Sequence, residues 1–343
     1  MSESAPKKRP VVLQLVRFVP LAVFWLLAVA LWFIDGISLY ILSGRWLLAP
    51  IVVAVLFAAM LWKPRKVAWT LAAGIGVFAI VLIWRDLLLP RNDRTWWDET
   101  AVMPVISVHE GVVTIDGVRN FTWDESGRTG GGWETRTYAL DDLQGVDLIV
   151  QPFPASELMA HTMLSFDFGP GGRLMLSIEA RKQQGENYSP VAGALNQFEL
   201  IYIFLDERDA LTTRAITRGD RLHAYPTRNR NPATLREFFV DLCESADGLR
   251  AWPRFYHIIF DNCTTVWIRH VDAIANTDIG LRWDTIATGR IARFLHMHDS
   301  IDTDQSYDEA KDFFRIDEQV RAFAEHPEFS RRIREQRMAS EPE

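Results

Sequence analysis

The chain has 343 residues, and its 37 Lys and Arg against 44 Asp and Glu give a formal net charge of −7. The charge is unevenly divided, because residues 1–90 hold nine basic and three acidic residues, which leaves 28 basic and 41 acidic residues for 91–343. An acidic domain repels the phosphates of nucleic acids, which excludes a nucleic-acid partner, and two cysteines are too few for a disulfide framework.

Three apolar runs among the first 90 residues predict transmembrane helices. Each run holds 17 or 18 residues without a charge, a length that spans the hydrocarbon core of a bilayer. No small-residue cleavage site follows the first run, which argues against a secretory signal peptide. We therefore expect residues 1–90 to form a membrane segment with three transmembrane helices, at about 18–34, 46–62 and 67–84.

Basic residues around these runs predict the orientation. Four of them precede the first span and three fill the turn 63–66, whereas the loop between the first two spans offers only Arg45. Positive charge favours the cytoplasmic side, so the N-terminus is expected in the cytoplasm and residue 91 onward across the membrane. In a bacterial inner membrane that side is the periplasm.

Beyond residue 90 the pattern changes to short alternating runs, which predict strands at 105–108, 112–115, 146–150, 163–168, 173–179 and 200–205. The Gly-rich stretch 126–132 has no phosphate-binding spacing and is interpreted as a loop. Helical periodicity follows at 233–246 and 263–274. Strands first and helices afterwards predict an α+β domain over 91–304, with a charged helical tail over 305–343.

Cys263 is the candidate nucleophile. It follows an apolar run at the predicted start of a helix, where Asp261 or Asn262 is a good N-cap. A thiol in the first turn of a helix meets the positive end of the dipole and free backbone N–H groups, which lower its pKa and can stabilise an oxyanion. The alternative is a small buried residue in the core. Three neighbours of Cys263 are candidate oxyanion or supporting residues: Asn262, Thr264 and Tyr256.

Cys243 has a different setting, since it lies in the middle of a predicted helix on an apolar stripe, which is typical of the core. A disulfide between Cys243 and Cys263 would be possible in an oxidising compartment and would remove the nucleophile.

A thiol nucleophile needs a base, and His161 is the preferred one of eight histidines. It opens the strand-like run 161–166, from which its side chain is expected to project at a sheet edge. Glu179 ends the opposite strand of the presumed hairpin, so antiparallel register would bring it to His161 as the third member of a triad. The alternative for Glu179 is a surface ion pair with Arg181. His270 is too far along the helix from Cys263 to share its proton.

The sequence lacks the motifs of metal sites and of serine hydrolases. No H-E-x-x-H or paired-cysteine spacing indicates a metal site, and no G-x-S-x-G elbow indicates a serine hydrolase. We expect neither a metal nor a cofactor.

Taken together, these residues resemble the Lnb N-terminal periplasmic domain family over roughly residues 97 to 284. Seven stretches in order carry the resemblance: Val118-Arg119-Asn120-Phe121, Ala160-His161-Thr162-Met163-Leu164-Ser165-Phe166, Ser177-Ile178-Glu179-Ala180-Arg181, Gly185-Glu186-Asn187-Tyr188-Ser189-Pro190, Glu199-Leu200-Ile201-Tyr202, Asp206-Glu207-Arg208-Asp209 and Asp261-Asn262-Cys263-Thr264-Thr265. In the family's named members the membrane spans follow this domain, whereas here the predicted spans precede it.

The resemblance implies a circularly permuted papain-like fold, in which the His strand precedes the Cys helix. It also implies transfer of an acyl chain from a phospholipid to the N-terminal amine of a lipoprotein, with Cys263 forming a thioester and His161 moving the proton. Phospholipid, lipoprotein and the bilayer are then the expected partners. Two alternatives stay open: a papain-like hydrolase of cell-wall peptides or lipids, and a non-catalytic envelope assembly module with a buried Cys263.

Overall fold

The computed structural model describes residues 89–154, 156–228 and 231–335. None of the helices in these ranges is long and apolar enough to cross a membrane. The three predicted spans lie outside the described residues, so they stay a prediction. The chain divides into two units, and the larger one comprises Pro90–Tyr188 and Asn196 onward. In the other unit a short helix, α4 (Pro190–Ala194), is capped by the Ser189 side chain.

An eight-stranded sheet forms the centre of the larger unit. The strands are β1 (Val105–His109), β2 (Val112–Asp124), β3 (Gly127–Ala139), β4 (Gly145–Phe153), β5 (Ser156–Asp167), β6 (Arg173–Arg181), β7 (Glu199–Asp206) and β8 (His223–Pro226). Their order is β1-β2-β7-β6-β5-β4-β8, with β3 paired to β2, and all neighbours are antiparallel except β2 and β7. With the helices below, this confirms the predicted α+β class.

One expectation about these strands was wrong. The Gly-rich stretch is not a loop, because residues 127–132 belong to β3 and pair with the end of β2. At Gly131, which has φ +79°, a Cβ atom would lie 2.1 Å from the Asn120 carbonyl oxygen, so this pairing needs glycine there. β5 lies between β4 and β6, but β6 pairs with it only from Met163 onward, so His161 lies where one side of β5 has no partner strand, as expected.

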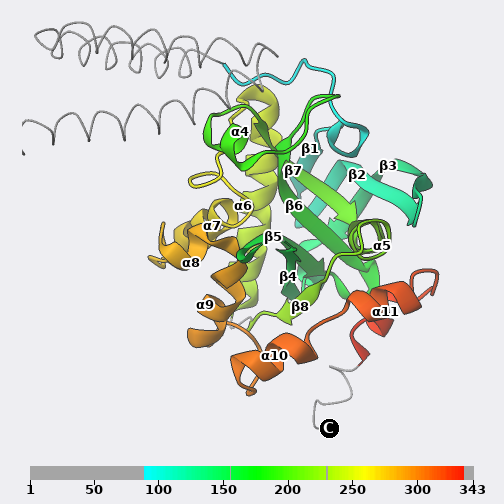
Figure 1. Cartoon of the computed structure of the whole chain (residues 1–343), viewed down its shortest axis with the longest axis vertical. Helices are drawn as coiled ribbons and strands as arrows, with labels where there is room; N and C mark the ends of the chain where they lie inside the picture. The colour runs from blue at the N-terminus through cyan, green and yellow to red at the C-terminus, as the bar shows by residue number, and fades with distance from the viewer. Residues whose placement is uncertain (1–88, 155, 229–230, 336–343) are drawn as a thin grey trace, which may run out of the picture. The chain divides into compact units, whose positions relative to one another are not determined.

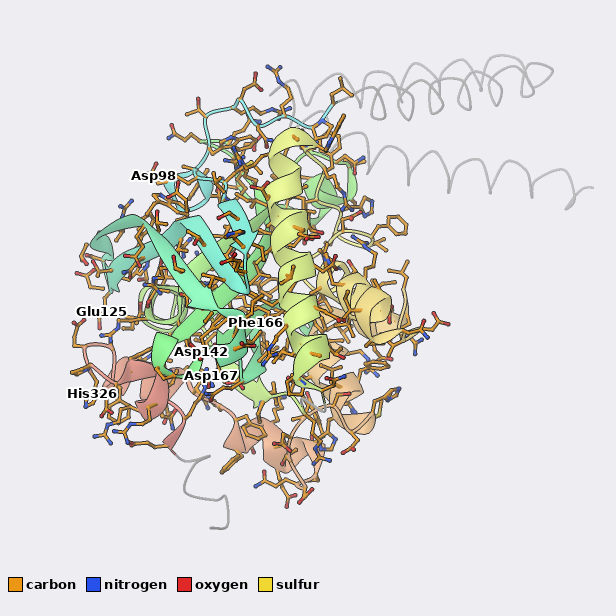
Figure 2. The ribbon with its side chains drawn as sticks, turned by 180° about the vertical axis from the view of Figure 1, so that it is seen from behind. Asp98, Glu125, Asp142, Phe166, Asp167 and His326 are labelled. Atoms are coloured by element: carbon orange, nitrogen blue, oxygen red, sulfur yellow. The ribbon has the colours of Figure 1, made fainter. Side chains whose placement is uncertain are left out.

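One face of the sheet is covered by α6 (Pro232–Ala251) and α7 (Thr265–Ala275), and Figure 2 shows α6 lying across the strands. Phe239 of α6 packs edge-on against Phe166 of β5, with ring centroids 4.8 Å apart, and also contacts Phe168 and Phe204. Cys243 lies in the same helix and is fully buried, as the sequence predicts for a core position.

The opposite face packs against α5 (Glu207–Thr212), the helical turn Thr213–Thr217 and the C-terminal helices. The remaining helices are α8 (Trp283–Ile286), α9 (Ile291–Met297), α10 (Tyr307–Phe313), α11 (Asp317–Ala322) and α12 (Phe329–Arg332), with a 3-10 turn η6 (Thr288–Arg290) before α9. Val320, Phe329 and Ile333 join the core on this face (Figure 1). The charged tail therefore supplies core residues as well as helices.

A buried ionic cluster also anchors the tail. Arg334 donates to Asp147 of β4 at 2.8 Å and to both carboxylate oxygens of Glu207, at 2.5 and 3.0 Å. All three side chains are buried. The last described turn of the chain is thus bonded to the centre of the sheet.

Candidate active site

Cys263 lies in the turn that leads into α7, two residues before the helix begins. Asn262 forms the cap, because its Oδ1 accepts the N–H groups of Thr264 and Thr265, each at 2.8 Å. The same amide donates from Nδ2 to the Ile258 carbonyl at 2.8 Å. Both ends of the Asn262 side chain are therefore engaged in holding the turn, whereas the Cys263 N–H has no acceptor among the described residues.

The Cys263 turn lies beside β5 at the point where β6 no longer pairs with that strand. The ladder between β5 and β6 ends at the pair Met163 and Ser177. Beyond that point Sγ of Cys263 donates to the Ala160 carbonyl oxygen at 3.8 Å. Thr288 of η6 bonds both backbone groups of Ala160, at 2.9 and 2.6 Å. The sulfur therefore sits alongside the strand that carries His161.

A second set of contacts ties β5 to α7. Thr162 Oγ1 lies 2.9 Å from Thr264 Oγ1 and accepts the indole N–H of Trp267 at 3.3 Å. Thr264 is fully buried, and its hydroxyl is 4.0 Å from the Cys263 sulfur. Thr162 and Thr264 thus fix the position of the turn relative to the strand.

His161 is held by a relay on the other face of the strand. Its Nε2 lies 2.8 Å from Ser177 Oγ, which donates to Glu179 Oε1 at 2.7 Å. Arg214 donates to the same carboxylate oxygen at 3.1 Å. Nε2 of His161 is 3.7 Å from Glu179 Oε1, so the predicted proximity of His161 and Glu179 is observed, with Ser177 between them. Arg181 instead bonds the carbonyls of Thr100 and Ala101.

The relay fixes the tautomer of the imidazole. A hydroxyl has one proton, and Ser177 gives it to Glu179, so Ser177 must accept a proton from Nε2 of His161. Nδ1 is then the unprotonated nitrogen and carries the lone pair that a base needs. No hydrogen bond joins His161 to the Cys263 sulfur among the described residues, and such bonds often form only when substrate is bound.

Burial keeps both reactive groups neutral. It lowers the pKa of His161 to about 4, more than the nearby Glu179 carboxylate raises it. Burial also raises the pKa of the Cys263 thiol, which outweighs the hydrogen bonds from Thr162 and Thr264. The expectation of a thiol pKa lowered by the helix start was therefore wrong, because desolvation of the thiolate dominates and Asn262 already occupies two N–H groups of that turn.

Glu179 stays ionised in the same environment. Burial alone would raise the pKa of its carboxyl, but His161, the Arg214 guanidinium and the Ser177 hydroxyl together hold that pKa well below its usual range. Arg214 is cationic at neutral pH, since burial lowers its pKa only to about 10. A neutral imidazole is therefore oriented by a paired carboxylate.

A cavity of about 170 Å³ joins these groups. It is lined by Cys263, His161, Glu179, Asn262 and Tyr256. Thr264 is buried and does not line it. Tyr256 is buried and hydrogen-bonded to Tyr188. Sequence reasoning missed several groups that line the cavity or orient its residues: Gln151, Ser177, Lys182, Arg214 and Arg218. A larger hollow, of about 410 Å³ beside Trp97 and Phe121, contains no nucleophile–base pair.

The described residues contain no metal-like cluster of three or more His, Cys, Asp or Glu side chains. Cys243 and Cys263 are both free thiols, so the disulfide that would have blocked Cys263 is not formed.

Comparison with known families gives a match for part of the chain. Residues 131–290 match the model of the Lnb N-terminal periplasmic domain, which confirms the resemblance seen in the sequence motifs. The matched region runs from β3 to η6 and includes His161, Glu179 and Cys263. The match supports a periplasmic location for the C-terminal domain. No match was found among curated proteins or among solved structures.

Proposed function

We propose that this domain is a periplasmic cysteine acyltransferase, which moves an acyl chain from a phospholipid to the N-terminal amine of a lipoprotein through a thioester on Cys263. The observation that carries the proposal is a cavity lined by both a free thiol and a neutral imidazole with a fixed tautomer. The match to a family of periplasmic domains supports it. The order of His strand and Cys turn is also that of a circularly permuted papain-like fold, which we propose for residues 91–304.

The first half-reaction forms the thioester. Nδ1 of His161 takes the proton of the Cys263 thiol as Sγ bonds to the ester carbonyl carbon. The unpartnered N–H of Cys263 donates to the oxyanion of the tetrahedral intermediate. The carbon–oxygen bond to the glycerol backbone then breaks, and the departing oxygen takes the proton from His161. Ser177 and Glu179 keep the imidazole oriented while it carries positive charge.

The second half-reaction transfers the chain. An amine nitrogen attacks the thioester carbonyl and gives a proton to His161, and the carbon–sulfur bond breaks to form the amide. The thiolate then takes the proton back from His161, which restores the neutral pair.

Single substitutions test the chemistry. Cys263→Ala and His161→Ala should each abolish acyl transfer in full-length protein while the far-UV circular dichroism spectrum stays unchanged. Cys243→Ala is the matched control, since it removes the other free thiol from the helix core, and it should retain activity. Full function of both cavity variants in cells would refute every enzymatic role and favour the assembly module.

Mass spectrometry of lipoprotein N-termini identifies the acceptor. N-acylated termini should be present with wild-type protein and missing with Cys263→Ala. Unchanged termini, combined with release of free fatty acid by wild-type protein alone, would show that water is the acceptor and would make the protein a hydrolase.

A further inference from the structure

The loop before Cys263 presents two large apolar side chains on a rigid tip. His257 and Asp261 pair with each other through both backbone groups, at 3.2 and 2.9 Å. The His257 ring accepts the N–H groups of Ile259 and Phe260, at 3.1 and 3.3 Å. These bonds hold the tip in shape, yet Ile259 is 37% exposed and Phe260 52% exposed. A fixed tip with exposed apolar side chains is typical of a contact surface.

The first residues of the larger unit contact the end of α6 and the segment that leads to the tip. Asn92 donates to the last carbonyls of α6, at 2.9 and 3.2 Å, and Trp252 follows directly with 81% of its side chain exposed. The Arg91 N–H bonds Glu199, whose backbone pairs with Phe255 on the segment that leads to the tip. Figure 1 shows the first described residues at the C-terminal end of α6.

The side chains at the base of the tip and in the cavity carry more positive than negative charge. Arg254 and Arg269 both bind one carboxylate, Asp261, at the base of the tip. Lys182, Arg214 and Arg218 line the cavity. Arg214 pairs with Glu179 and Arg218 with Glu99. Residues 91–343 as a whole hold 28 basic and 41 acidic residues, so this concentration of cations is local.

We propose that this end of the domain, the docking face formed by Trp252, Ile259 and Phe260, inserts into the headgroup layer of an anionic bilayer. Tryptophan and exposed apolar side chains favour that layer, and the surrounding cations attract acidic lipids. The last predicted span ends at Trp84, and the seven residues from there to Arg91 reach about 25 Å when extended. The tether therefore keeps the docking face within reach of the membrane surface.

The benefit of docking for acyl transfer rests on the proposed function. A docked tip places the mouth of the Cys263 cavity at the lipid surface, because Ile258 lines the cavity and Ile259 is the next residue. The acyl donor then enters from the leaflet without crossing water. The docking face thus selects lipids in a bilayer over dissolved esters.

Spin-label depth measurements test the docking directly. Full-length protein with Cys263→Ser is labelled at Phe260→Cys and placed in nanodiscs of phosphatidylethanolamine and phosphatidylglycerol. The matched control carries the label at Met297→Cys at the end of α9, where the native side chain is 58% exposed. We expect oxygen to relax the label at 260 more than a water-soluble nickel chelate does, and the reverse at 297. Greater nickel access at both positions would overturn docking.

An activity measurement separates docking from chemistry. The triple substitution Trp252→Ser, Ile259→Ser and Phe260→Ser should lower thioester formation from nanodisc phospholipid at least tenfold, while the rate with a soluble short-chain thioester stays within twofold. Met297→Ser should change neither rate. Equal rates of the triple variant and wild type on nanodisc lipid would overturn the inference. If wild-type protein forms no thioester with either donor, the proposed function fails, whereas docking is still decided by the depth measurement.

Discussion

The protonation state of the Cys263 thiol gives the sharpest test of the site. A free cysteine with a pKa of about 8.5 is about 3% thiolate at pH 7, and a thiolate–imidazolium pair would be almost wholly ionised there. Burial raises the pKa of Cys263 and lowers that of His161, so the structure predicts a neutral resting pair. We expect Cys263 to react with iodoacetamide at pH 7 no faster than glutathione, which is about 30-fold slower than a fully ionised thiol of equal intrinsic reactivity.

The assay is alkylation of full-length protein in detergent from pH 5 to 10, followed by mass spectrometry of the peptide that contains Cys263. The rate should rise about tenfold per pH unit between pH 6 and 8, because the thiolate fraction does so below the pKa. His161→Ala should leave this profile unchanged while it abolishes acyl transfer. The buried Cys243 serves as the internal unreactive thiol. A rate that is already constant between pH 6 and 8 would refute the neutral pair.

Three further predictions concern the relay and the stability of the domain. Ser177→Ala removes the acceptor for Nε2 of His161, so kcat for acyl transfer should fall by about 10- to 100-fold with little change in KM, and Ser177→Thr should restore part of it. Burial lowers the pKa of His223 from 6.5 to about 4, so its contribution to stability is complete above pH 6.5 and is lost as the pH falls towards 4. Urea denaturation of wild-type protein at pH 5 should therefore show about 2 kcal/mol less stability than at pH 8 from this group, a loss that His223→Phe should abolish. Arg334→Met removes the buried guanidinium that bonds both Asp147 and Glu207, leaving Asp147 with Arg173 and Glu207 with the Ser165 hydroxyl, and should cost about 3 to 5 kcal/mol. Arg331→Met at an exposed pair should cost less than about 1 kcal/mol in the same titration.

Local patterns predicted most of the strands and both long helices, because alternation and helical spacing are properties of neighbouring residues. The sheet order needed contacts between distant segments, so the parallel pairing of β2 with β7 was not predicted. The Gly-rich strand β3 misled the prediction for a local reason, since glycine usually marks turns. The tight approach at Gly131 depends on a partner strand that the spacing of glycines does not reveal.

The candidate site was predicted in part. The residue types and their context pointed to Cys263, His161 and Glu179, which line one cavity. Ser177 was missed although it lies two residues before Glu179 on β6, whereas Arg214 was missed because it reaches the site from the distant turn Thr213–Thr217. Polar residues on otherwise apolar segments were the available signal, since Ser177 interrupts a strand of Leu, Met and Ile, and a buried Arg214 needs a carboxylate. A search for such interruptions would have found the relay.

The neutral pair also suits the proposed acyl transfer at a lipid surface. An ionised thiolate and imidazolium in an empty, buried cavity would need water to solvate them, and an acyl chain could enter only by displacing that water. Here the charge of Glu179 is already balanced by Arg214, so the cavity offers two uncharged reacting groups to an apolar substrate. Charge separation is then required only as the sulfur attacks, when the oriented imidazole, the Glu179 relay and the Cys263 N–H can stabilise it.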